Sequence, residues 1–499
     1  MPWEAAPRTR YRYYFLQLDS SGAGVEPGDR QFLIQNGDDA LIATDASDVF
    51  VVSHGWMEDV DSAKRNYGDW IDTMVAQGEH GDALAGAGYK PQAVAVHWPS
   101  QPFGDERPLA PADELADQYT RRILGTDDAG ADSPRAVSAR AALKAIIDSA
   151  DDIAPDAVAR RSLVQGDLAR LPKLNDAYQQ LFTATGVARP GLDPGKAIRD
   201  WTVAVHQEPP SSGFLDDVVH DVERLWDELV AALDHEVTNV RSLVLLPARA
   251  LSFWSIKDRA HAIGAGTTHQ LLARLQETAP RARFHLMGHS FGAIVASSAV
   301  VGPPGGAAGA GPLPRPVSSA LFAQAAMSLW SYAAHDPFDT SEAGDYRSIY
   351  PAGPPLIAGP LVTTTSVYDL ANRILFPIAA QLGSPDIQAA VASAAAGAPG
   401  PGRGPQSAGA AFPRYGAVGT FGLQGVLGRA EPRTVDRVGM GVPHQEYQLE
   451  PGRIYNADAD AVIRKLPGLA GAHMDINHPE IAHLFWQAVR AGAGGPGQD

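Results

Sequence analysis

The segment Gly288-His289-Ser290-Phe291-Gly292 joins a stretch of strand character to a stretch of helix character. Residues 283–287 before it are largely apolar, and residues 293–300 after it are small and apolar. A G-x-S-x-G pattern in this setting predicts a nucleophile elbow, a sharp turn that presents the serine hydroxyl at the end of a strand. Glycine suits both flanking positions, because the turn brings backbone against backbone. The segment therefore predicts an α/β fold in which Ser290 is the nucleophile.

The composition is that of an ordinary globular protein and excludes several kinds of function. Of the 499 residues, 45% are hydrophobic and 19% are charged. The net charge of -17, with no basic cluster, argues against a nucleic-acid partner. The lack of cysteine excludes disulfides, thiolate metal sites and a cysteine nucleophile. No signal-peptide pattern and no apolar run of about 18 residues is present, so we expect a cytoplasmic protein without an integral membrane segment. Secretion and the oligomeric state remain open.

The order of strand and helix patterns predicts a mostly parallel central sheet flanked by helices. Residues 48–52 and 93–96 are buried-strand runs on either side of a helical pattern at 59–77, which together predict a βαβ unit. Further strands are expected at 11–18, 31–34, 317–322, 361–366 and 453–457, and a final helix at 479–490.

Residues 101–252 interrupt this sheet pattern with helical patterns, at 112–124, 133–151 and 214–237. We therefore predict one catalytic domain, formed by residues 1–100 and 253–499, with a helical cap inserted at 101–252. The segment 389–411, almost all Ala, Gly, Pro and Ser, is expected to be a flexible excursion within the catalytic domain.

An acid and a base follow the elbow in the order that such a fold requires. A serine hydroxyl attacks well only when a histidine takes its proton and a carboxylate orients that histidine. Asp369 stands just beyond the strand expected at 361–366. His473 lies in a Gly-rich loop between the last strand and the last helix. We therefore predict Asp369 as the acid and His473 as the base.

Other residues compete for these roles. Asp336 and Asp339 follow the preceding strand and are alternative acids, and His478 and His483 are alternative bases. A capping or packing role in the last helix suits both of these histidines. Residues 473–478 also resemble a metal cluster, but they lack a third strong ligand. No metal and no cofactor are expected.

Backbone N–H groups near the serine are expected to hold the oxyanion of the tetrahedral intermediate. One belongs to Phe291, directly after the nucleophile, and the other to Trp56, after the turn His54-Gly55. His54 and His289 are expected to be structural. Together with Gly55 and Trp98, they are also expected to line the substrate pocket.

Several segments resemble the bacterial α/β-hydrolase superfamily of esterases and lipases, in particular hydrolases with a helical insertion and a His-Gly oxyanion loop. The matching segments are residues 53–56, 97–100, 257–260, 285–292, 365–369 and 471–476. They cover both halves of the sheet but hardly the insertion. The resemblance implies Ser290, Asp369 and His473 as the catalytic triad. Such sequences often have histidine in the place of Thr365, so the loop that bears the acid departs from the family pattern.

The expected activity is hydrolysis of small-molecule carboxylic esters through an acyl-enzyme, with a preference for neutral esters of short to medium chain length. Peptidase, thioesterase or acyltransferase chemistry would use the same triad. A catalytically silent scaffold that binds a partner through its helical insertion is the alternative outside enzyme function. The family resemblance does not supply a substrate.

Overall fold

The computed structural model describes most of the chain. The described residues are 3–26, 45–56, 58, 60–79, 89–100, 111–124, 133–185, 194–195, 198, 237–303, 311–334, 343–351, 353–381, 415–426, 436–440, 445–465 and 472–492. Three predicted segments lie outside these residues wholly or almost wholly: the strand at 31–34, the helix at 214–237 and the excursion at 389–411.

The described residues form one nine-stranded sheet, with the strand order β1-β2-β4-β3-β5-β6-β7-β9-β8. Every neighbouring pair is parallel except β1 and β2, so the predicted α/β fold with a mostly parallel sheet is confirmed. The strands are β1 (Trp3–Ala5), β2 (Arg12–Gln17), β3 (Asp48–Ser53), β4 (Pro91–His97), β5 (Arg283–His289), β6 (Ser319–Ala323), β7 (Leu361–Thr365), β8 (Asp436–Gly439) and β9 (Ile454–Asp458).

The strand order changes direction beside β3, and this change determines where a site can form. The chain passes from β3 through α2 (Val60–Glu79) to β4, which pairs with β3 in parallel as the predicted βαβ unit requires. It then returns to the other side of β3 as β5. In open parallel sheets, ligands bind outside the carboxyl ends of the strands where such a change occurs. The carboxyl ends of β3 and β5 are therefore the expected location of a site.

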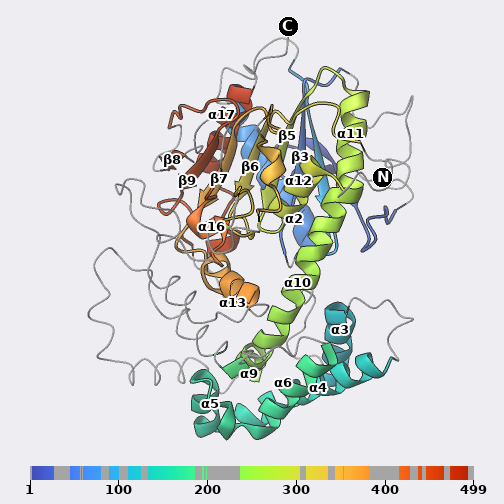
Figure 1. Cartoon of the computed structure of the whole chain (residues 1–499), viewed down its shortest axis with the longest axis vertical. Coiled ribbons are helices and arrows are strands. Elements are labelled where there is room, and N and C mark those ends of the chain that lie inside the picture. The colour runs from blue at the N-terminus through green and yellow to red at the C-terminus, as the bar shows by residue number, and fades with distance from the viewer. Residues whose placement is uncertain are drawn as a thin grey trace. The chain divides into compact units, whose positions relative to one another are not determined.

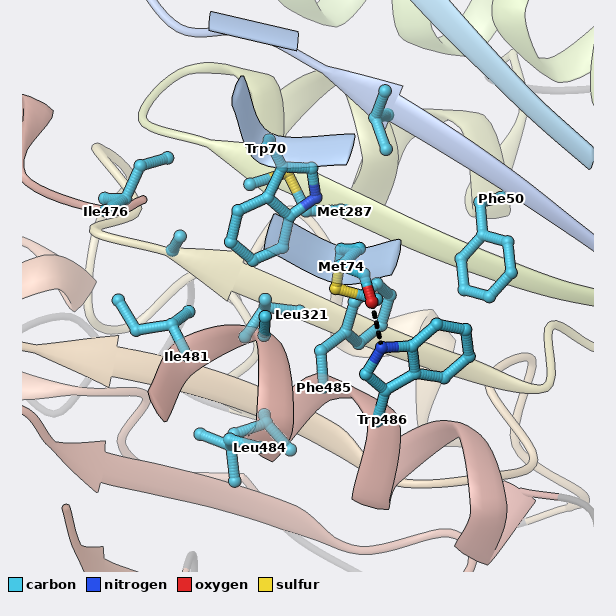
Figure 2. Close-up of a cluster of buried hydrophobic side chains, with 14 of the residues drawn as sticks. Phe50, Trp70, Met74, Met287, Leu321, Ile476, Ile481, Leu484, Phe485 and Trp486 are labelled. Atoms are coloured by element: carbon cyan, nitrogen blue, oxygen red, sulfur yellow. Dashed lines mark hydrogen bonds between the residues drawn. The ribbon is translucent and has the colours of Figure 1, made fainter. Parts of the chain in front are cut away.

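Helices cover both faces of this sheet (Figure 1). On one face, α2 and α17 (Pro479–Gly492) pack with side chains of β3, β5 and β6 in a single apolar cluster. Figure 2 shows Phe50, Met287 and Leu321 of the sheet beneath Phe485 and Trp486 of α17. The indole N–H of Trp486 donates to the carbonyl oxygen of Met74 over 2.7 Å and so links α17 to α2.

The opposite face carries α12 (Gly292–Val301), which follows the elbow directly. Because side chains alternate along a strand, Met287 points toward α17 and the next residue, Gly288, points toward α12. A Cβ atom at Gly288 would lie 2.5 Å from the backbone nitrogen of Ala293. Glycine at this position therefore lets α12 start close against the sheet.

Residue contacts divide the chain into two compact units. Unit 1 comprises residues 1–100, 257–373 and 398–499, and contains the sheet. Unit 2 comprises residues 101–256 and 374–397, so it includes a second segment beyond the single insertion expected at 101–252. The rings of Phe253 and Phe376 meet edge to face at 5.2 Å, which joins this second segment to the rest of unit 2.

The described part of unit 2 is helical. Its elements are α3 (Ala112–Leu124), α4 (Pro134–Ile153), α5 (Ala157–Val164), α6 (Pro172–Thr185), α9 (Val237–Val244), the first part of α10 (Leu246–Ile263) and α13 (Phe376–Gln381). Helix α4 begins where its sequence predicts, because the Ser133 hydroxyl accepts a hydrogen bond from the Ala136 N–H at the first turn. The hydroxyl of Tyr178 donates to the carbonyl oxygen of Val244 over 2.6 Å and ties α6 to α9.

None of the helices in the described ranges combines the length and the apolar character that a membrane crossing needs.

The cluster beneath α17 should carry much of the stability of unit 1. Phe485→Ala removes a side chain that is 1% exposed, and we expect a loss of about 3–5 kcal/mol in the free energy of unfolding. Met474→Ala is the control, because Met474 is 40% exposed, and it should change that free energy by less than about 0.5 kcal/mol. Urea denaturation would measure both. Equal, small losses would contradict this account of the core.

Candidate active site

Ser290 occupies a strained turn between β5 and α12. Its φ angle is +56°, a left-handed conformation that side-chain-bearing residues rarely adopt. The Ser290 N–H donates to the carbonyl oxygen of Ala323 over 3.1 Å, and the Ser290 carbonyl accepts from the Ala293 N–H. These bonds hold the turn between β6 and the first turn of α12. The predicted sharp turn with a strained serine is therefore present.

The backbone of this turn touches the backbone at the end of β3. A Cβ atom at Gly292 would overlap the carbonyl oxygen of Ser53 and would lie 2.6 Å from that of His54. A Cβ atom at Gly55 would overlap Cβ of Ser290 and would lie 3.0 Å from its hydroxyl oxygen. Both positions need glycine, because no side chain fits between the two segments.

Ser290, His473 and Asp369 form a continuous hydrogen-bonded chain. The hydroxyl oxygen of Ser290 lies 2.8 Å from His473 Nε2, and His473 Nδ1 lies 2.8 Å from Asp369 Oδ2. A carboxylate only accepts hydrogen bonds, so Nδ1 carries the proton and Nε2 is left to accept the serine proton. All three side chains are buried. The structure thus brings together the three residues that the sequence predicted, from loops after three different strands.

The rival residues do not join this chain where the structure describes them. His478 Nε2 pairs with Asp475 Oδ1 at 2.9 Å, and the His478 carbonyl accepts the Ile481 N–H at the start of α17. His483 Nε2 lies 3.0 Å from the carbonyl oxygen of Gln445. These contacts fit the expected capping and packing roles. Asp336 and Asp339 lie outside the described residues.

A second Ser–His–Asp set exists at the opposite edge of the sheet. His285 Nδ1 lies 2.8 Å from the hydroxyl of Ser319, and His285 Nε2 lies 2.9 Å from Asp48 Oδ1. Ser319 and Asp48 are the first residues of β6 and β3, so this set stands at the amino ends of the strands. Burial lowers the pKa of His285, and all three residues are fully enclosed. This set is a cross-strand packing network.

His54 organises the loop that follows β3. Its Nε2 accepts from the Trp98 N–H over 3.2 Å and lies 2.9 Å from His97 Nδ1, so its Nδ1–H donates to the carbonyl oxygen of Gly55. The indole of Trp98 stacks on the His54 ring with an interplanar angle of 3°, and the Tyr67 hydroxyl accepts the His54 N–H. Burial holds the pKa of His54 well below its usual range, so the ring is uncharged.

These contacts bear on the predicted substrate pocket and oxyanion hole. His54 and Trp98 are buried against each other, and they support the turn at Gly55 from behind. The ring of Trp56 lies 5.7 Å from that of Phe291, the N-cap residue of α12, so the two predicted donor residues are neighbours. The roles of their N–H groups toward an oxyanion, and direct contact of His54, Gly55, Trp98 or His289 with substrate, stay predictions.

His289 links β5 to the loop that contains His473. Its Nε2 donates to the carbonyl oxygen of His473 over 2.9 Å, and the two rings lie 5.0 Å apart. Burial, together with the nearby His473, lowers the pKa of His289 to about 3, so the ring stays neutral and keeps this donor. The expected structural role of His289 is therefore specific, because its hydrogen bond holds the backbone of His473 in place.

Two further residues that sequence reasoning missed surround Asp369. Gln324 Nε2 and Asn372 Nδ2 both donate to Asp369 Oδ2, over 2.8 and 2.7 Å, and the Asn372 N–H donates to Oδ1 over 2.9 Å. The last contact has the form of a helix N-cap, but any residue except proline supplies that backbone N–H, so it does not single out Asn372 in the sequence. No local pattern marks Gln324, which follows a different strand.

Among the described residues, no group of three His, Cys, Asp or Glu side chains could hold a metal ion. Comparisons with protein-family models, with curated protein sequences and with solved structures returned no match.

The contact between the elbow and β3 should tolerate no added methyl group. Gly292→Ala forces the two backbones apart, and we expect the free energy of unfolding to fall by about 3 kcal/mol. Gly266→Ala is the matched control, because a Cβ atom there meets nothing within 4 Å, and the helical position should gain up to about 1 kcal/mol. Chemical denaturation of both variants decides the point. A Gly292→Ala protein as stable as the wild type would contradict the geometry.

Burial of neutral His289 should make the protein less stable in acid. Between its ordinary pKa of 6.5 and its folded value of about 3, the unfolded chain binds the extra proton, so stability falls as the pH falls. His289→Gln keeps an N–H donor but removes the titration. It should therefore reduce the slope of unfolding free energy against pH by about 1.4 kcal/mol per pH unit between pH ~4 and ~6. Denaturation at a series of pH values measures this slope, and an unchanged slope would contradict a buried neutral ring.

Proposed function

We propose that this protein is a serine hydrolase of the α/β-hydrolase superfamily that cleaves carboxylic esters. The observation that carries the proposal is the chain from Ser290 through His473 to Asp369, with two hydrogen bonds of 2.8 Å. Two further features support it. The serine stands in a left-handed turn between a strand and a helix, and it lies at the carboxyl edge where the strand order reverses.

In the proposed reaction, Ser290 Oγ attacks the carbonyl carbon of the ester while its proton passes to His473 Nε2. The carboxylate of Asp369 keeps Nδ1 protonated and stabilises the imidazolium that forms. Collapse of the tetrahedral intermediate breaks the ester C–O bond, and the leaving alkoxide takes the proton from His473. Water then attacks the acyl-enzyme with His473 again as base, and the carboxylic acid and free Ser290 result.

The proposed oxyanion donors are the backbone N–H groups of Phe291 and Trp56. Support comes from their position: Phe291 begins α12, and Gly55 brings the loop that contains Trp56 against Ser290. Preorganised donors of this kind contribute much of the rate enhancement in acyl transfer. The packing of His54 and Trp98 behind the turn would keep the loop in place during the reaction.

The helical cap is proposed to be residues 101–256 with 374–397. Within unit 1, the chain reaches residue 100, after which this segment begins, just after the carboxyl end of β4, and β4 runs parallel to the strand that precedes Ser290. We propose that it selects neutral esters of short to medium chain length, because the net charge of -17 disfavours anionic substrates.

The experiment that tests the proposal is labelling with a fluorophosphonate probe, followed by hydrolysis of p-nitrophenyl esters of graded chain length. The wild type should label, and Ser290→Ala should abolish both labelling and hydrolysis. His473→Asn and Asp369→Asn should each lower turnover by about 10³-fold or more, because the serine loses its base or the imidazole loses its orientation.

The matched control is Ser319→Ala, which removes a second serine, among the described residues, that contacts a histidine paired with an aspartate. It should label at the wild-type rate. Labelling that survives Ser290→Ala but is lost in Ser319→Ala would overturn the assignment of the nucleophile. A wild-type protein that neither labels nor cleaves any ester would overturn the proposed function. Faster cleavage of peptides or thioesters than of oxygen esters would change the substrate class.

A further inference from the structure

Gln324 stands where β6 ends, in a backbone conformation that needs explanation. Its φ angle is +46°, so it is one of three described non-glycine residues with positive φ, together with Arg10 and Ser290. A glutamine in this region is strained, and strain of this kind persists only where the surroundings hold the residue firmly. Two of these three residues, Ser290 and Gln324, belong to the hydrogen-bonded chain around Asp369 or contact it directly.

Every polar group of Gln324 has a partner. Its N–H donates to Thr364 Oγ1, and its side-chain Oε1 accepts from the same hydroxyl, both over 3.0 Å. Its carbonyl oxygen accepts from Asn372 Nδ2 over 2.7 Å. Because Thr364 occupies Oε1, the amide nitrogen is the end that faces Asp369. Thr364 on β7 thus sets the orientation of the side chain that donates to the carboxylate.

Asn372 completes the enclosure of the carboxylate. Its Nδ2 donates to both Asp369 Oδ2 and the carbonyl oxygen of Gln324. A Cβ atom at Gly419, in the short helix α16 (Val418–Phe421), would overlap Asn372 Nδ2, so a glycine there makes room for the amide. The carbonyl of Gly419 also accepts from Gln324 Nε2 over 3.3 Å. Side chains from the segments after β6 and β7 therefore both donate to one carboxylate, which is fully buried.

We propose that Gln324 and Asn372 are positioning residues, which fix the Asp369 carboxylate against His473 Nδ1 and limit how strongly its charge stabilises the protonated imidazole. This inference rests on the proposed function. Both side chains donate to Oδ2, the oxygen that also accepts from His473. Hydrogen-bond donors to a carboxylate partly neutralise its negative charge and fix its orientation. Without Gln324 and Asn372, the Asp369 carboxylate can rotate, and its full negative charge stabilises the protonated imidazole of His473.

The titratable groups near Asp369 and His473 do not account for the change in the stability of the protonated imidazole that we expect when Gln324 or Asn372 is replaced. His289 from β5 faces the ring of His473 and is neutral. Arg373 follows Asn372 and donates to the Val367 carbonyl, and Asp460, after β9, accepts the Val367 N–H. Gln324 and Asn372 are themselves uncharged. Replacing either by an apolar residue of similar size therefore changes hydrogen bonding at Asp369 without changing any charge.

The test compares Gln324→Met and Asn372→Leu with the wild type in the hydrolysis of p-nitrophenyl butyrate over a range of pH. For each variant we expect kcat to fall about 10- to 100-fold and KM to stay within about twofold. The acid limb of the pH–kcat profile should move to higher pH by a few tenths to about one pH unit, because the protonated imidazole gains stability.

The matched control is Gln276→Met. Gln276 is another buried glutamine whose amide joins two segments, since it donates to the Arg315 carbonyl and accepts the Arg315 N–H, both over 3.0 Å. It should lose stability as Gln324→Met does, yet keep the wild-type kcat and pH profile in its folded fraction. If Gln324→Met and Asn372→Leu behave like this control, their role is merely structural and the inference is overturned.

A readout that does not need activity separates this inference from the proposed function. NMR of protein labelled with ¹³C in histidine follows the titration of each ring, and the His473 signal is the one lost in His473→Asn. Movement of that titration to higher pH in Gln324→Met supports the inference even if no ester is cleaved. An unmoved titration overturns it even if the wild type is an active hydrolase.

Discussion

The contact between the elbow and the end of β3 is the constraint on which the rest of the site depends. The backbone around Gly292 lies against the carbonyl groups of Ser53 and His54, and Gly55 lies against Ser290. The turn that holds the serine and the loop proposed to hold the oxyanion therefore form one tightly packed piece. The remaining groups reach this piece from elsewhere. His473 lies on the loop before α17, and its Nε2 contacts the hydroxyl of Ser290. His289 donates a hydrogen bond to the carbonyl oxygen of His473, and Asp369 lies within hydrogen-bonding distance of the His473 Nδ1 atom.

The sequence predicted the buried elements of the fold well, because their signal is local. The apolar runs of β3 and β4 and the start of α4 after Ser133 lie where the patterns placed them. The short strands β1 and β8 were missed. Each is an edge strand of three or four residues, and its pairing depends on the neighbouring strand and not on a pattern of its own. The sequence pattern assigned residues 374–397 to the catalytic domain, whereas the contacts place them in unit 2. The contact of Phe376 with Phe253 joins residues more than a hundred positions apart, so no local pattern indicates it.

The candidate site likewise contains residues that the sequence predicted and contacts that it did not. Ser290, Asp369 and His473 could be found because each follows the carboxyl end of a strand, in the order that the predicted fold requires. Their supports could be found only in part. His54 and His289 were expected to be structural, but their partners, and the roles of Gln324 and Asn372, could not be predicted. Gln324 reaches Asp369 from the end of another strand, and Trp98 reaches His54 from the end of the neighbouring strand. A hydrogen bond between distant segments leaves no periodic trace in the sequence. It becomes visible only when the strands are placed side by side. The proposed reacting groups are thus predictable from the sequence, whereas the contacts that hold them are not.

The buried network of Ser319, His285 and Asp48 has a consequence for how enzymes are recognised from coordinates. A search template that contains only a hydroxyl, an imidazole and a carboxylate within hydrogen-bonding distance would match the described residues at both sets. The polarity of the strands separates the two matches. Ser319 is the first residue of its strand, whereas Ser290 follows the last residue of its strand and has a left-handed φ angle. Geometric templates for hydrolases would become more selective if they also encoded strand direction and backbone conformation.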